Sequence, residues 1–326
     1  MEADRPVVLR WEALTKKRFD AIDRARAVVL VTCSPLEVHG PHLPLGADVL
    51  QGEGLLERTL ALLPERHRRR TFLKLPCVYA ATDALPHAGS LFFRPSTTIA
   101  VLEDLGRSLA SQGFRDVLVS NFHGSPRHFL AIETACERVH RTTGLRMVSV
   151  FSVLVGRLTG GGAELYETLG SLPGIDAEQL RGDTHAGLVE TSQLLALHPE
   201  WVERDYGTLP RRTSDLWLVE RGERPAAVVP GQPAGLLTML RAFRGVLRFF
   251  RAETYAGAPG GASPALGARI LETLSAHAAG AVTEILDGTL PPARWHSPLW
   301  SRRFFFVNPW MVRLFDRLLG VPPGVA

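Results

Sequence analysis

The sequence is poor in lysine. Of its 37 cationic side chains only three are lysines, Lys16, Lys17 and Lys74, and the rest are arginines. With 33 acidic residues the formal net charge is only +4. Proteins that bind nucleic acid combine a basic patch with a recognition motif, and no such motif accompanies these arginines. We therefore expect no nucleic-acid partner.

Cysteines and long apolar runs are also scarce. The three cysteines, Cys33, Cys77 and Cys136, stand far apart, which argues against a disulfide framework and against a cysteine metal cluster. No stretch approaches the roughly 20 apolar residues of a membrane span, and the N-terminal residues lack the apolar core of a signal peptide. We expect a cytoplasmic protein.

The hydrophobic content of 45% is that of a globular chain with a core. Short apolar runs predict buried strands at 27–33, 116–120 and 146–154, with helical patterns between and after them. Strands that alternate with helices indicate an α/β protein whose mostly parallel sheet is covered on both faces. The predicted helices are 50–63, 99–112 (with Gly113 just after its end), 129–142, 166–178, 187–197 and 266–286; residues 205–235 look irregular.

Residues 1–288 are predicted to form one domain, and 289–326 an extension rich in aromatic residues and arginine. Within the extension, Asn308 and Pro309 are typical of a helix start, and Gly320 of a helix end. Residues 236–251 form a second amphipathic, arginine-rich stretch. Both stretches could pack on the domain, contact a second copy of the chain or lie on a membrane surface. We favour packing or a homo-oligomer contact over the membrane.

Chemically reactive side chains gather in three segments, each at a predicted strand end or helix start. The carboxyl ends of parallel strands lie at one edge of a sheet, where ligands bind. We therefore expect the three segments to converge. Glu37, His39, His42 and Asp48 follow the first strand, Asn121, His123, Gly124 and Ser125 follow the second, and His185 and Glu190 open a helix.

The spacing of these residues suits a metal site. Glu37 and His39 are two apart, so an extended chain points both to one side. Asp183 or Thr184 can cap the next helix, which places His185 near its positive end. Each residue alone fits a hydrogen-bonded structural role better. Together, five of them favour a metal centre: Glu37, His39, Asp48, His123 and Glu190.

The ligand types and their charge indicate which metals would bind. Mixed carboxylate and imidazole ligands suit Zn, Mn or Fe(II). Three carboxylates and one bridging hydroxide carry four negative charges, which two divalent ions balance. The sequence therefore predicts two transition-metal ions per chain.

The segment from Glu37 to Asp48 (EVHGPHLPLGAD) resembles the creatininase signature E-Q-H-G-P-H-L-P-x-x-x-D. The segment from Asn121 to Gly124 is similar to that family's N-G-H-G, and the segment from His185 to Ser192 to its H-A-G-x-x-E-T-S. Weaker similarities lie at 88–91 and 255–267. The resemblance runs in order from about residue 25 to 288.

The resemblance implies a three-layer α/β/α sandwich and a metal-dependent amidohydrolase that acts on a C–N bond of a cyclic or linear amide. It implies that Glu37, Asp48 and His123 hold one metal and His39, Asp48 and Glu190 the other. A water activated by the metals would attack the carbonyl carbon. His185 would be the catalytic residue that delivers a proton to the leaving nitrogen.

The chain differs from the family pattern around the substrate. Val38 replaces the family's glutamine, Ser125 stands where creatininase proper has a metal-binding glutamate, and His87 replaces a phenylalanine. No tryptophan lies between Phe151 and Asp183. We assign His87, Gly124 and Ser125 to substrate binding, with His42, Asp83 and His128 as further residues that could line the cleft. A small formamide or other amide fits these changes better than creatinine. The alternatives are a peptidase that trims a modified precursor peptide, and a catalytically idle scaffold of the same fold.

Overall fold

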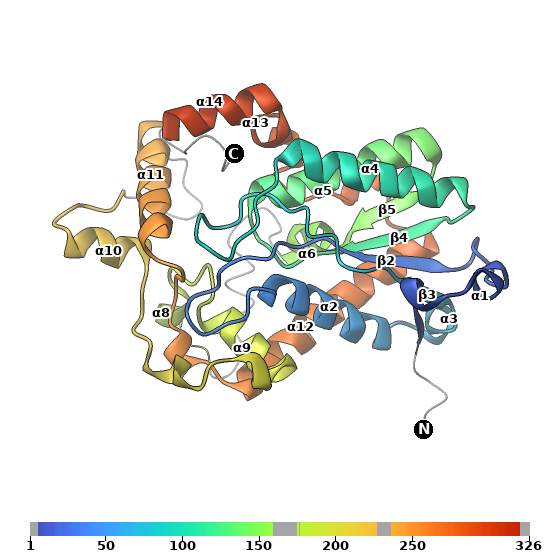
Figure 1. Ribbon diagram of the computed structural model, residues 1–326, viewed down its shortest axis with the longest axis horizontal. Coiled ribbons are helices and arrows are strands. Elements are labelled where there is room, and N and C mark those ends of the chain that lie inside the picture. Colours follow the sequence, from blue (N-terminus) through green and yellow to red (C-terminus); the bar gives the residue numbers. More distant parts are fainter. Residues whose placement is uncertain (1–5, 159–174, 176, 227–235, 320–326) are drawn as a thin grey trace.

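A five-stranded parallel sheet forms the centre of the computed structural model, which describes residues 6–158, 175, 177–226 and 236–319 (Figure 1). The strand order is β1-β3-β2-β4-β5, and each neighbouring pair is parallel. The strands are β1 (Val7–Arg10), β2 (Val28–Thr32), β3 (Thr71–Lys74), β4 (Asp116–Ser120) and β5 (Arg146–Ser149). The predicted parallel sheet is confirmed.

Helices cover both faces of this sheet. Successive side chains of a strand point to opposite faces. Val28 and Leu30 of β2 therefore join one core, and Val29 and Val31 join the other. Figure 1 shows α2 and α12 on one side of the sheet and α4 and α5 on the other. The three-layer α/β/α sandwich is thus confirmed. These helices are α2 (Ala47–Ala61), α12 (Pro264–Asp287), α4 (Pro95–Ser111) and α5 (Pro126–Thr143).

The strand order determines where a site can form. From β2 the chain crosses to β3 on one side of the sheet, and it returns to β4 on the other side. Loops that leave two neighbouring strands in opposite directions open a crevice at their carboxyl ends. The candidate ligands that follow β2 and β4 lie at this crevice.

Two predicted elements are wrong. The strand predicted at 146–154 ends at Ser149, where the chain turns into helix α6 (Val150–Leu158). The Ser149 hydroxyl accepts a hydrogen bond from the Ser152 N–H at 3.2 Å, which is a helix-capping contact inside an apolar run. In the stretch expected to be irregular, Thr213 caps helix α10 (Ser214–Glu220) in the same way.

The other helices agree with the prediction within a few residues, apart from 166–178, most of which lies outside the described residues. Gly113 follows α4 with a φ of +90°, as expected of a glycine at that position. The remaining elements are α1 (Lys16–Asp20), α3 (Glu65–Arg68), α8 (Ala177–Leu180), α9 (Leu188–Leu197) and the short 3-10 helices η1 (Trp11–Ala13), η2 (Pro199–Trp201), η3 (Arg204–Thr208), η4 (Pro259–Gly261), η5 (Pro292–Arg294) and η6 (Trp300–Arg302).

The C-terminal extension packs onto the sandwich. It holds α13 (Arg303–Val307), which contacts α5, and α14 (Pro309–Leu319), which contacts α11 (Leu236–Ala252). The predicted start of α14 is confirmed, because Asn308 Oδ1 accepts hydrogen bonds from the N–H groups of Trp310 and Met311; Gly320 lies outside the described residues. Within the described ranges no helix is long and apolar enough to span a membrane. The domain boundary at residue 288 stays a prediction.

Glu133 of α5 is buried where the extension meets the sandwich. We expect its carboxyl to make the stability of the protein depend on pH. Burial raises the pKa of this carboxyl to about 7, although its Oε1 accepts a hydrogen bond from the Ser297 N–H at 3.0 Å. The folded state therefore holds a proton that the unfolded state has already lost between pH 4.5 and 7. Binding of this proton stabilises the folded state. The stabilising contribution is fully present below the unfolded pKa and is lost as the pH rises through 7.

Glu133→Gln removes this titration and keeps an acceptor for Ser297. Relative to that of wild type, the free energy of unfolding of the variant should rise by on the order of 2–3 kcal/mol between pH 5 and pH 8. Urea unfolding of both proteins at the two pH values measures the change. Glu272→Gln, an exposed glutamate of α12, is the control. A pH-independent difference between Glu133→Gln and wild type would contradict the assignment.

Candidate metal centre

The loop after β2 brings Glu37, His39 and Asp48 together. The Glu37 N–H donates to the Leu45 carbonyl at 2.8 Å, so the chain folds back on itself before α2 begins. Asp48 then lies in the first turn of α2, at the helix end where a carboxylate is stabilised. All three residues are fully buried. Their convergence, expected from the spacing and the turn residues, is found.

The two carboxylate oxygens of Asp48 face two different groups of residues. Oδ1 lies 3.4 Å from His39 Nε2, which in turn lies 3.8 Å from Glu190 Oε2. Oδ2 lies 3.3 Å from His123 Nδ1, which in turn lies 3.2 Å from Glu37 Oε2. Asp48 is therefore shared by two sets of three potential ligands, as a bridging ligand between two metals would be.

The donor atoms fit metal ions in number, kind and spacing. Ligands at about 2.0–2.2 Å from a tetrahedral ion lie roughly 3.3–3.6 Å from one another, and the distances above are close to that range. Among the described residues, three sets of ligand atoms converge closely enough to hold an ion: Glu37, Asp48 and His123; His39, Asp48 and Glu190; and Glu37, His39 and His185. Four buried atoms of this cluster have no hydrogen-bond partner in that part of the chain: Glu37 Oε2, His39 Nε2, Asp48 Oδ2 and His123 Nε2.

A second ring of hydrogen bonds orients the candidate ligands. The Nδ1 of His39 lies 3.0 Å from the Glu37 carbonyl, so Nδ1–H donates to it and Nε2 keeps its lone pair for a metal. The Oε1 of Glu37 accepts the Leu85 N–H at 2.5 Å, which leaves Oε2 facing His123. These contacts hold one acceptor atom of each residue toward the centre.

The buried carboxylates of the cluster shift the pKa values of their neighbours, because each charge lies close to another and away from water. Burial is the largest single influence on His39 and alone would lower its pKa, but the carboxylates of Asp48, Glu190 and Glu37 together outweigh it and raise the pKa to about 10. Burial raises the pKa of Glu190 to about 7. Without metal, the imidazoles of His39 and His123 therefore hold protons that offset the carboxylate charge, and bound cations would replace those protons.

Asp183 positions the third segment. Its Oδ1 accepts the Leu188 N–H at 2.6 Å and its Oδ2 the Val189 N–H at 3.0 Å, so its carboxylate caps the start of α9. Of the two residues predicted to cap this helix, Asp183 does so. Glu190 lies in the first turn of α9, and its Oε2 accepts the Ala186 N–H at 2.6 Å. The capped helix start thus aims the Glu190 carboxylate at His39.

His185 lies beside the ligand cluster with its ring 4.2 Å from that of His39. Its Nε2 lies 2.8 Å from the Val38 carbonyl and donates its hydrogen there, which leaves Nδ1 as the unprotonated nitrogen. Burial, followed by the charge of His39, lowers the pKa of His185 to about 4. The side chain is therefore a neutral imidazole at the edge of the cluster.

A cavity of about 870 Å³ opens onto these residues. Glu37, Asp48, His123, His185 and Glu190 lie in its wall, and so do Gly124, Ser125 and Asp83 from the sequence-based list. No described part of the cavity wall includes His87, whose Nε2 instead contacts the Phe250 carbonyl at 2.7 Å and ties the 81–90 loop to α11.

Two further histidines from that list are buried structural partners. His42 Nε2 contacts the Thr191 hydroxyl at 2.8 Å, and His128 Nε2 contacts the Cys33 carbonyl at 2.9 Å. Each contact joins two of the segments that carry candidate ligands. His42 and His128 thereby help to hold the ligand-bearing segments together. Neither lines the described part of the cavity wall.

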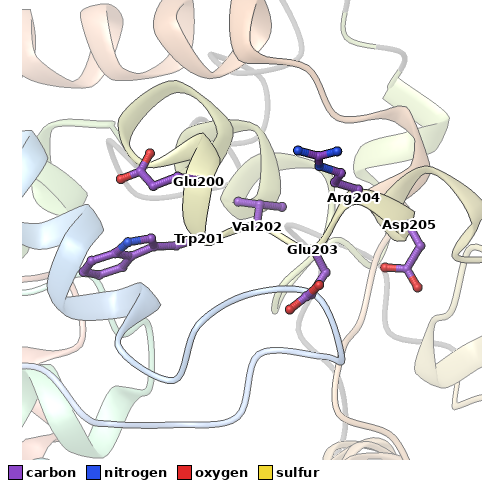
Figure 2. A pocket seen from close by; sticks show the side chains of 6 residues that line it. All are labelled: Glu200, Trp201, Val202, Glu203, Arg204 and Asp205. Carbon is purple, nitrogen blue, oxygen red and sulfur yellow. The ribbon is translucent and has the colours of Figure 1, made fainter.

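A second hollow lies elsewhere on the surface. Figure 2 shows its lining, six consecutive residues from Glu200 to Asp205, with Trp201 and Asp205 at opposite ends of the row. Its volume is about 450 Å³, and none of the candidate metal ligands lies in its wall. The candidate metal centre therefore belongs to the larger cavity.

Sequence reasoning missed an ion pair in the cavity wall, that of Arg127 with Asp316. Arg127 Nη2 donates to Asp316 Oδ1 at 2.5 Å. The two residues are 189 positions apart, so no local pattern links them. A part-buried ion pair between α5 and the extension appears only once the chain has folded.

Comparison with known proteins agrees with this geometry. The family model described as creatininase, creatinine amidohydrolase, matches residues 12–282. Among solved structures, a manganese creatininase is 20% identical with a TM-score of 0.56 and covers 86% of this chain and 98% of its own. A mutant creatininase complexed with creatine is 20% identical with a TM-score of 0.53 and covers 86% and 99%. A putative creatinine amidohydrolase from Bacteroides fragilis is 19% identical with a TM-score of 0.56 and covers 88% and 98%.

The search of curated proteins found no match. The structural likeness shows the shared fold, and the family model extends over most of the chain, including every candidate ligand. The chain therefore belongs to the creatininase family.

Proposed function

We propose that the chain is a metal-dependent amidohydrolase that uses two transition-metal ions, Zn, Mn or Fe(II). The observation that carries the proposal is the position of the Asp48 carboxylate, whose two oxygens each face a separate set of ligand atoms. A manganese creatininase and a Zn–Zn creatininase are among the solved structures of similar fold. The manganese and zinc of these relatives support a metal of this kind.

In this proposal Glu37, Asp48 and His123 hold one ion, and His39, Asp48 and Glu190 hold the other. When bound, the two ions lower the pKa of a water and polarise the scissile carbonyl. Three carboxylates in a buried site then meet enough positive charge to remain ionised. Mixed imidazole and carboxylate donors agree with the metals named.

His185 is the proposed proton carrier. Its Nε2–H is engaged by the Val38 carbonyl, so Nδ1 is the atom that accepts a proton and passes it to the leaving nitrogen. Burial keeps the pKa of the metal-free side chain low, near 4. A base that returns its proton readily suits the second of these two steps.

The cavity favours a substrate larger than creatinine. At about 870 Å³ it is near the upper end of the roughly 300–1,000 Å³ of small-molecule sites, and part of its wall is apolar, with Phe129, Phe151, Val246 and Leu247. These features support hydrolysis of a substituted amide, and they equally support the second candidate, trimming of a modified precursor peptide.

We expect the protein to act as a homo-oligomer. Phe304 and Phe305 of α13 and Trp310 of α14 are about half exposed or more, with values of 55%, 49% and 62%. Aromatic side chains next to arginines are enriched in protein interfaces. Their exposure supports contact with a second copy of the chain.

Metal analysis and hydrolysis together test the proposal. Elemental analysis of the purified protein should give about two transition-metal ions per chain. A panel of formamides, anilides and short peptides should be cleaved, and creatinine should be cleaved poorly. Chelation should abolish cleavage and Zn or Mn should restore it. A chain that takes up no metal on reconstitution would favour the scaffold alternative.

His185→Gln tests the proton carrier. The variant should keep about two metal ions while kcat falls by about 10²–10³-fold, because only the proton transfer is lost. His198→Gln, a histidine outside the cavity, is the control and should retain wild-type kcat. Loss of an ion from His185→Gln would instead make His185 a ligand with Glu37 and His39.

A further inference from the structure

A polar cluster in the cavity wall lies outside the metal ligands. The Ser125 hydroxyl donates to Asp83 Oδ2 at 2.7 Å, and Arg127 Nη1 donates to Asp83 Oδ1 at 3.4 Å. Arg127 Nη2 donates to Asp316 Oδ1 at 2.5 Å. All four residues line the cavity. Two carboxylates share a single guanidinium, so the cluster carries an excess negative charge.

One oxygen of this cluster has no partner. Asp316 is only 4% exposed, and its Oδ2 accepts no hydrogen bond within the described part of the chain. Burial raises the pKa of Asp316, while Arg127 opposes that rise. A buried carboxylate oxygen without a donor is costly, so this atom calls for a donor that the described residues do not supply.

Asp316 lines the same cavity as the metal centre. Ser125 is two residues after His123, and Leu85, two residues after Asp83, donates its N–H to Glu37. Asp316 itself comes from α14, which lies beyond the region matched by the family model. The extension therefore adds an acceptor from outside the matched region.

The rest of the wall is consistent with a ligand that reaches from the metals to Asp316. Phe151, Val155, Val246 and Leu247 supply apolar surface. Arg251 is the other arginine of the wall, and it is exposed. Among the buried side-chain atoms of the described wall, Asp316 Oδ2 is the one outside the metal cluster that makes no hydrogen bond, and it is an anionic acceptor.

We propose that Asp316 is a specificity residue, whose free carboxylate oxygen binds a cationic N–H group, such as an ammonium or guanidinium, at the non-reacting end of the substrate. The inference rests on the proposed function and extends it: the substrate is an amide with an apolar middle and a cationic end. Charge-assisted hydrogen bonds to a buried carboxylate are among the stronger polar contacts in proteins, which makes the preference measurable.

A structural role for the Arg127–Asp316 pair makes a different prediction. A pair that only fastens α14 to α5 would, when broken, loosen the cavity wall and weaken charged and neutral ligands alike. A recognition role weakens the charged ligand selectively. The comparison of two ligands of equal shape therefore separates the two roles.

The test measures binding of 2-phenylethylammonium and of its neutral counterpart 2-phenylethanol to the metal-loaded full-length protein by calorimetry. Wild type should bind the ammonium at least about tenfold more tightly. Asp316→Asn should lose that preference, and Asp316→Glu should retain part of it. The matched control is Asp287→Asn, since Asp287 is also paired with an arginine, Arg66 at 2.6 Å, but lies outside the cavity wall.

An equal loss of affinity for both probes, an unchanged preference in Asp316→Asn, or no preference in wild type would each overturn the proposal. Metal content and amide hydrolysis of the same preparations keep the two claims apart. Hydrolysis without an ammonium preference rejects the recognition role of Asp316 alone. An Asp316-dependent preference in a protein that neither holds metal nor hydrolyses amides rejects the reaction and leaves the binding site.

Discussion

Asp48→Ala should empty both metal positions and reduce amide hydrolysis by at least about 10³-fold. Asp48 is the one side chain that belongs to both proposed ligand sets. Without it, each set keeps only two protein ligands, His39 with Glu190 and His123 with Glu37. Catalytic sites of this type use three protein ligands for each ion, so two are too few to retain it.

A graded series makes this prediction sharper. Glu190→Gln removes a ligand from the His39 set alone and should leave about one ion per chain. Asp104→Ala is the control for Asp48→Ala: it makes the same chemical change on the exposed surface of α4 and should leave about two ions per chain. Elemental analysis after dialysis, with far-ultraviolet circular dichroism to check folding, reads out the series.

Retention of one ion by a folded Asp48→Ala variant would contradict the bridging arrangement. It would assign that ion to residues that do not need Asp48, and the third set, Glu37, His39 and His185, is the one that remains complete. The charge argument for two ions would then fail as well, since a single ion would balance the carboxylates that are left.

The candidate ligands could be predicted because they lie in short contiguous segments. Glu37, His39 and Asp48 share one loop, and the turn residues between them already indicate that the chain folds back. His123 follows a second buried strand, and Glu190 follows a capped helix start. The strand order then brings these segments to one edge, as parallel sheets generally do.

Other features could not be predicted because the decisive contact is not local. The apolar run 146–154 is compatible with either a strand or a helix, and a single hydroxyl, that of Ser149, starts the helix. Strands β1 and β3 are four residues each, too short to show a pattern. The pairing of Arg127 with Asp316 depends on how the extension packs, which no motif records.

Gly267→Ala should destabilise the protein by about 3 kcal/mol or more. Gly267 lies in α12 where it crosses α9, and an added Cβ would lie 1.8 Å from the Ser192 carbonyl oxygen and 2.9 Å from the Gln193 nitrogen. Both neighbours are backbone atoms of a helix, so neither can rotate away. The gain of about 1 kcal/mol that alanine brings to a helix cannot offset this overlap.

The same substitution elsewhere on α12 should have the opposite sign. At Gly280 an added Cβ would meet only the end of the Arg157 side chain at 3.3 Å, and the position is exposed. Gly280→Ala should therefore stabilise the protein by about 0.5–1 kcal/mol. Urea unfolding of Gly267→Ala and Gly280→Ala measures the free energy of unfolding of both. It compares the same substitution at a tightly packed and at an exposed position of α12.

Gly267→Ala should also affect the metal centre, because the atoms that must move belong to α9. Ser192 is two residues after Glu190, and a shift of this turn would carry the Glu190 carboxylate away from His39, from which it now lies 3.8 Å. Whatever folded Gly267→Ala protein is recovered should hold less metal than Gly280→Ala. Equal stability and equal metal content in the two variants would mean that the helix crossing does not position Glu190, and the close approach at Gly267 would then have no part in building the site.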